Sequence, residues 1–345
     1  FASANAGELS VSGTAKATYN IQGGKTNADK GLGVTNELNF TASGELDNGY
    51  TWSYSMELDP NAVSAGTTGS AENDDTQMKL TTPYGTFGVM ISEGGLDVED
   101  AASQSVYSRP TDSGDPSATS DNFSIDSYNN IQYHTPADMM PFGITAKIAY
   151  ATDLSDTAPA SSSNNAGAVS TKSITYAGDS ATEYQVKAAP IDGLAIGASY
   201  MNFDNGGLAT NDQEAESGAY YATYASGPFS IGYSRAYKAP QLGGNLSSTA
   251  GGTRATSAVE YYDQTNYSIA YAVSDALSIS YENETSEANY ALSTTANVEQ
   301  ESTGVQLAYT MGGMTLAVAH NDHDNNGYST TAETDQTILA VTMAF

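Results

Sequence analysis

Alternation of apolar and polar residues with a period of two runs through almost the whole 345-residue chain and limits its fold more than any other feature. The first such segment, GELSVSGTAKATYN, places Leu9, Val11 and Tyr19 on one face and Ser, Thr and Lys residues on the other. This period is that of a β-strand with two different faces. Helical spacing is scarce, so the sequence predicts an all-β fold.

The connections between these segments alternate between short and long. Seven short ones hold turn residues such as Asp47-Asn48-Gly49, a strong hairpin signal. Eight long, polar ones include a first near 23–32 and a third at about 93–127. Sixteen strands follow, and closing such a sheet removes its two long edges. Because short turns on one rim and long loops on the other are typical of outer-membrane barrels, we predict a sixteen-stranded antiparallel transmembrane β-barrel, a single domain over 1–345.

The chain ends on the same alternation, in DQTILAVTMAF, with Leu339, Val341, Met343 and Phe345 on one parity. Terminal residues are usually loosely held, so large apolar side chains there indicate a partner. We therefore expect the last strand to pair with the first. Its apolar stripe would face lipid, with Phe345 in an aromatic girdle at the rim.

Composition excludes several classes of protein. No run approaches the roughly 18 consecutive apolar residues that a membrane helix needs, and mean hydropathy is -0.37. The absence of cysteine excludes a disulfide scaffold or a thiolate metal site. A net charge of -29 disfavours nucleic-acid partners, whose phosphates must be neutralised by basic side chains.

Several motifs occur in a characteristic order: the opening strand GELSVSGTAKATYN, the hairpin LDNGYTWSYSMEL, the segment YGTFGVMIS entering a long third loop, NNIQYHTP leaving it, and the terminal Phe345. Together they resemble the general diffusion porins of Gram-negative bacteria, especially the alphaproteobacterial type. The resemblance implies a trimeric outer-membrane barrel with short periplasmic turns and long extracellular loops, surrounded by lipid and lipopolysaccharide. It also implies a third loop that folds inward to narrow a passage for small hydrophilic solutes and ions.

The chain departs from this family where its members often carry basic residues across the constriction. The matching positions hold Glu37, Thr41 and Gln132. We therefore expect a weaker transverse field than is usual in the family.

The third loop is strongly acidic, with eight Asp and Glu residues against one base, Arg109. Its segment EGGLDVED carries Glu93, Asp97, Glu99 and Asp100, which we expect at the pore constriction, where carboxylates would concentrate cations. The alternative is a solvated loop facing outward. For Asp112, Asp115 and Asp121 we favour that alternative.

Parity predicts which strand residues line the lumen. Lipid-facing lysine is costly, so Lys16, Lys79, Lys147 and Lys187 should point inward, as should Glu37 and Glu57. Gln132 joins this wall by the resemblance. If the first loop centres between residues 27 and 28, Lys16 lies opposite Asn39 and diagonal to Glu37. Two interpretations of the lysines stay open: a remnant of the basic wall, or charges neutralised locally by Glu37 and Glu183.

No cofactor is required, although the acidic excess suggests possible calcium binding. Asp97 and Glu99 could gather Ca²⁺, and NDHDNNGY places Asp322 and Asp324 two residues apart before a glycine. The segment lacks the distal bidentate Glu of an EF-hand, so a solvated loop tip is the alternative. No spacing of Ser and His indicates a catalytic triad.

The sequence thus predicts a passive outer-membrane diffusion channel for small hydrophilic solutes that prefers cations. Two alternatives remain. One is a substrate-specific channel of the same fold, and the other is a plugged barrel with a structural or adhesive role.

Overall fold

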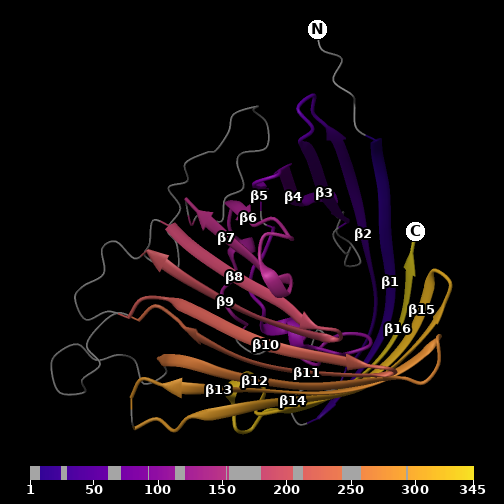
Figure 1. Cartoon of the computed structure of the whole chain (residues 1–345). Coiled ribbons are helices and arrows are strands. Elements are labelled where there is room, and N and C mark those ends of the chain that lie inside the picture. The colour runs from indigo at the N-terminus through magenta and orange to yellow at the C-terminus, as the bar shows by residue number, and fades with distance from the viewer. Residues whose placement is uncertain are drawn as a thin grey trace.

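The computed structural model describes residues 8–24, 29–60, 71–91, 93–112, 121–152, 154, 180–204, 213–242, 258–292 and 294–345. They form a closed antiparallel barrel in which each strand pairs with its neighbours in sequence and β1 pairs with β16 (Figure 1). The strands are β1 (Glu8–Gly24), β2 (Asp29–Glu45), β3 (Thr51–Pro60), β4 (Ala71–Thr82), β5 (Gly85–Ile91), β6 (Asn130–His134), β7 (Thr145–Ala151), β8 (Ser180–Ile191), β9 (Leu194–Asp204), β10 (Glu216–Ser226), β11 (Phe229–Ala239), β12 (Val259–Ala272), β13 (Leu277–Tyr290), β14 (Val298–Met311), β15 (Met314–Asp324) and β16 (Glu333–Ala344). The predicted sixteen-stranded all-β barrel is confirmed.

Helical structure in the described residues is limited to four short 3₁₀ turns: η1 (Glu99–Ala102), η2 (Ile125–Ser127), η3 (Pro141–Gly143) and η4 (Asn326–Tyr328). None of these helices is long and apolar enough to cross a membrane.

The order of short and long connections follows the prediction, but the first hairpin is longer than expected. β1 runs to Gly24 and β2 starts at Asp29, so the ladder extends through residues that the sequence suggested were loop. Glycines 31 and 33 pair within this ladder, where their sequence pattern resembles a turn. The register therefore differs: Lys16 lies opposite Thr35, not Asn39, although Glu37 is still diagonal to it.

Closure depends on the pairing of the two chain ends. Thr14 lies opposite Ala344, and the ladder continues to Gly24 opposite Thr334. At the rim, Gly13 N–H donates to the Phe345 carbonyl at 2.8 Å and Phe345 N–H donates to the Gly13 carbonyl at 3.0 Å. The prediction that the last strand pairs with the first is confirmed.

The two faces of the barrel differ in chemistry. Outward positions carry exposed apolar side chains, such as Tyr184 and Val186 in β8 and Leu339 in β16. Buried packing lies on the inner side, between the wall of β7–β11 and the connection from β5 to β6. There Phe123 of this connection meets Phe203 of β9 edge-on, with ring centroids 5.0 Å apart.

We predict that Gly13→Val weakens closure of the barrel. A Cβ at Gly13 would lie 2.6 Å from the Glu37 carbonyl and 2.9 Å from the Phe345 ring, and such overpacking costs about 1–3 kcal/mol. Gly31→Val is the control, since no described atom lies within 4 Å of a Cβ there. Thermal unfolding followed by gel mobility should rank Gly13→Val below Gly31→Val, and equal stabilities would contradict the role of this contact.

Candidate functional site

The connection between β5 and β6 is the third long loop, and its described residues, 93–112 and 121–129, lie along the inner wall of the barrel (Figure 1). Its outgoing arm, residues 93–112, contacts side chains of β6 and then of β8 to β14, and its return arm, residues 121–129, contacts β10, β8 and β6. The wall side chains involved share the parity opposite to the exposed apolar residues. The third loop therefore occupies lumen space.

Glu183 of β8 joins both arms of the third loop. Its Oε2 accepts hydrogen bonds from the backbone N–H of Leu96 at 3.2 Å and of Ile125 at 3.0 Å. Two residues further along the same face, Gln185 Nε2 donates to the Leu96 carbonyl at 2.7 Å. A fully buried carboxylate thus satisfies two loop amides that would otherwise lack partners.

Polar side chains, mostly serines, continue this contact across β9 to β14. Each donates to or accepts from the loop backbone or a loop hydroxyl: Ser199 to Val98, Ser217 to Phe123, Ser234 to Glu99, Ser268 to Ala102, Ser280 to Val106, Glu282 to Ser103 and Ser105, and Gln306 to Tyr107 and Ser108. The Ala102 carbonyl approaches Gly232 of β11 so closely that a Cβ at this position would have no space. Both described arms of the loop are thus held to the wall at several points.

Arg109, the single base of the loop, is shared by four carboxylates. Its guanidinium contacts Asp100, and it lies 3.3 Å from Asp112, 3.5 Å from Asp121 and 3.1 Å from Glu284 of β13. The arginine side chain is only 8% exposed, so its charge needs these partners. We favoured solvated roles for Asp112 and Asp121, but both are ion-paired here; Asp115 lies outside the described residues.

Glu99 does not face the lumen as predicted. It is buried between the two arms, and both of its carboxylate oxygens accept from Asn122 N–H, at 2.8 and 2.9 Å. Desolvation raises the pKa of Glu99 to about 8. At neutral pH this group is therefore mainly uncharged and contributes little to the field in the pore.

The other three predicted carboxylates are more accessible. The Asp100 side chain is 52% exposed beside Arg109, and Glu93 and Asp97 are half-buried. Burial, followed by the nearby charge of Asp126, raises the pKa of Asp97, while a hydrogen bond from Ser124 opposes that shift. Glu93 and Asp100 are therefore the stronger candidates for carboxylates that act on passing ions.

Three of the predicted wall lysines lie together. Lys79, Lys147 and Lys187 are half-buried on inward positions of β4, β7 and β8, close enough for their charges to interact. Of the two interpretations left open, local neutralisation by Glu183 finds no support, because that carboxylate binds loop amides. The lysines form a basic patch on the wall. None of them lies on a strand whose serines contact the third loop.

Lys16 and the wall acids lie on the neighbouring strands. Lys16 Nζ is 5.9 Å from the ring centroid of Tyr107, a cation–π contact with the outgoing arm. Glu37 accepts a hydrogen bond from Thr14 at 3.2 Å, and Glu57 lies opposite Asn39.

Gln132 has a different role from the one predicted. It is buried, donates to the Gly94 carbonyl at 2.5 Å and also contacts Asn130 and His134. It therefore holds the start of the third loop and does not line an open wall.

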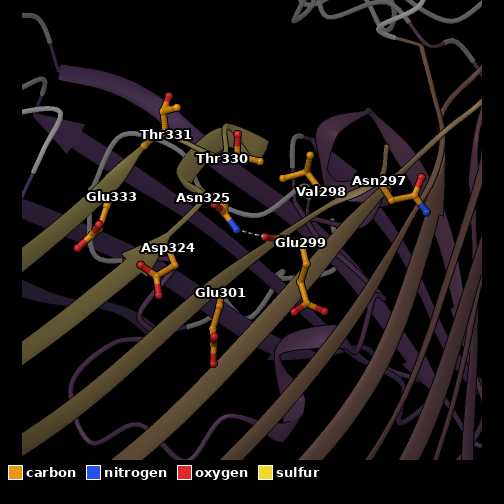
Figure 2. Close-up of a pocket in the computed structure, with 10 residues that line it drawn as sticks. Asn297, Val298, Glu299, Glu301, Asp324, Asn325, Thr330, Thr331 and Glu333 are labelled. Carbon is orange, nitrogen blue, oxygen red and sulfur yellow. Dashed lines mark hydrogen bonds between the residues drawn. The ribbon is translucent and has the colours of Figure 1, made fainter. Parts of the chain in front are cut away.

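The residues predicted as calcium ligands lie in two separate places, with Asp97 and Glu99 in the third loop and Asp322 and Asp324 on β15. Asp322 and Asp324 belong to β15 and point outward, not to a loop tip. Figure 2 shows Asp324 beside Glu301 and Glu333 on adjacent strands, around a cavity of about 370 Å³. Within the described part of the chain, no group of three or more His, Asp or Glu side chains could hold a metal ion.

Sequence reasoning missed the residues that fix the third loop, chiefly Glu183, Gln185, Glu282 and the inward serines. Part of their signal was present in the parity, because serine, glutamine and acidic residues recur at inward positions of β8 to β14. Without the path of the loop, nothing separated them from residues that face water.

We predict that Glu183→Ala loosens the third loop. Removing the acceptor leaves two buried amides unsatisfied, at about 1–3 kcal/mol for each. Single-channel recordings should then show noisier or multiple conductance levels. Glu37→Ala removes the same side chain from a wall position where its partner is Thr14, and it should leave the noise unchanged. A quiet Glu183→Ala channel would contradict the clamp.

The loop should also respond to pH through Glu99. Because its docked pKa of about 8 lies above the usual value of 4.5, docking is stabilised at low pH and weakens as pH rises from about 4.5 to 8. We expect more current noise at pH 9 than at pH 6 in the native protein. Glu99→Gln, which cannot ionise, should reduce the difference, and an unchanged difference would exclude Glu99 as the cause.

A family model described as Gram-negative porin matches residues 1–275 of the chain. No curated protein matches the chain significantly.

Solved structures of low identity share the fold. Salmonella typhi OmpF in complex with daunomycin is 15% identical, with a TM-score of 0.66, and 98% of each chain is covered. A mutant of the Rh. blastica porin is 15% identical, with a TM-score of 0.59, covering 98% of this chain and 100% of that one. A loop L8 deletion mutant of Vibrio cholerae OmpT is 14% identical, with a TM-score of 0.59, covering 99% and 100%.

Proposed function

The chain belongs to the family of Gram-negative porins, and on that premise we propose that it lets small hydrophilic solutes diffuse passively across the outer membrane with a preference for cations. The family and the barrel make it an integral outer-membrane channel. Transport through such a barrel involves no covalent chemistry. Selection depends on the width of the pore and on the charges that line it.

The observation that supports this proposal is the docking of an acidic loop against the inner wall. The exposed carboxylate of Asp100 and the half-buried Glu93 and Asp97 border the lumen from the loop, and Glu37 and Glu57 point inward from the wall. Weakly screened carboxylates in a narrow passage raise the local concentration of cations.

The basic patch of Lys79, Lys147 and Lys187 opposes this preference. We infer a moderate selectivity, set by the balance between the acidic loop and these lysines. Removing a lysine should therefore shift the balance toward cations, and removing a loop acid should shift it toward anions.

The test is the reversal potential of the purified protein in a planar bilayer under a KCl gradient. We expect a cation preference that falls in Glu93→Gln/Asp100→Asn and rises in Lys147→Ala. Glu99→Gln is the matched control, since its carboxyl group is mainly protonated at pH 7 and its neutralisation should change little.

Other outcomes separate the alternatives. If the channel conducts and Glu93→Gln/Asp100→Asn leaves the reversal potential unchanged, selectivity would depend on the wall residues. Saturable block of the conductance by one solute would favour a substrate-specific channel. Absence of conductance would favour a plugged structural barrel. Assembly as a homotrimer stays a prediction, for which size measurement in mild detergent is the test.

A further inference from the structure

An apolar groove of about 500 Å³ lies on the outer face of the barrel, over β9 to β13. It is bordered almost entirely by carbon atoms of outward side chains. These are Leu194, Ala222, Tyr224, Ile231, Tyr233, Tyr267, Ile269 and Tyr281. Because the chain is an outer-membrane porin, this face meets the hydrocarbon of the membrane.

The groove exists because one small residue lies among large ones. Ala222 of β10 lies opposite Tyr233 of β11, which in turn lies opposite Tyr267 of β12. The ring centroids of Tyr233 and Tyr267 lie 5.1 Å apart with the rings tilted by 44°, and Tyr220 and Tyr224 flank the alanine on its own strand. The missing side-chain volume at Ala222 leaves a trough with aromatic walls.

A basic side chain lies at the loop end of this groove. Arg235 is the next outward residue after Tyr233 on β11 and lies opposite Tyr220. Its Nη2 donates to Asp263 of β12 at 2.6 Å, yet the two side chains remain 45% and 40% exposed. Among the described residues, only Arg235 and Lys30 carry a positive charge on an outward strand position.

An exposed guanidinium on the lipid side of a barrel is costly unless an anion is near. Asp263 accepts from one nitrogen of the planar Arg235 guanidinium, which leaves the other N–H groups of this guanidinium as donors for a second partner. Phosphate oxygens match that fork geometry. The long-loop rim of a porin is extracellular, so the headgroup would belong to a lipid of the outer leaflet.

We propose that this surface binds one phosphorylated, acylated lipid of the outer leaflet. An acyl chain lies in the groove over Ala222, between Tyr224, Tyr233 and Tyr267, and the phosphate contacts Arg235. Asp263 competes with the phosphate for the guanidinium. The inference rests on the outer-membrane location and is independent of the ion preference proposed above.

Titration of the delipidated protein with diphosphorylated lipid A, followed by native mass spectrometry, tests the site. Arg235→Ala should weaken binding about tenfold or more, as expected for loss of a charge-assisted contact. Asp263→Asn should strengthen binding several-fold, because it frees the guanidinium. Ala222→Leu, which fills the groove, should weaken it, and Lys30→Ala, the other outward base, is the matched control and should leave binding unchanged.

The opposite signs of the two charge variants distinguish a lipid site from a merely structural ion pair. If Arg235→Ala and Asp263→Asn weakened binding equally, or if neither changed it, the proposal would be wrong. Lipid A stripped of its phosphates should bind the native protein and Arg235→Ala alike; a tenfold difference would overturn the phosphate contact. Dissociation of oligomers by Ala222→Leu without an effect on lipid would instead make the groove a contact between copies of the chain.

Discussion

The pairing of β1 with β16 is the constraint on which the rest of the molecule depends. In hydrocarbon no water is available to satisfy exposed backbone amides, so a sheet must close on itself. Here the two chain ends complete the ladder from Gly24 opposite Thr334 to the reciprocal hydrogen bonds of Gly13 and Phe345. Once the ladder is closed, the parity of every strand decides which side chains meet lipid and which meet the lumen.

That division of faces gives the interior its function. Serine, glutamine and acidic residues at inward positions on β8 to β14 hold the third loop by its backbone. Inward positions on β4, β7 and β8 carry the lysines. The lumen therefore lies between an acidic loop and a partly basic wall, and buried Arg109 offsets part of the loop's charge by joining four of its neighbouring carboxylates.

Much of this was predictable from local pattern, because strand period and turn residues are local properties of the sequence. Alternation predicted sixteen strands and the pairing of the ends, whereas residues 23–32 were predicted as a long loop although residues 29–32 pair with β1. The roles of Glu99 and Gln132 were not predictable. Both depend on where a loop of nearly forty residues crosses strands far away in sequence, and no local rule encodes that path.

A cysteine pair tests the position of the third loop on the inner wall, in a chain without native cysteine. Ala102 of the loop and Ala236 of β11 pack in one buried cluster. In Ala102→Cys/Ala236→Cys we expect a disulfide to form under mild oxidation while the channel continues to conduct. Two free thiols, with the one at position 102 labelled by a bulky membrane-impermeant maleimide added from outside, would contradict the account.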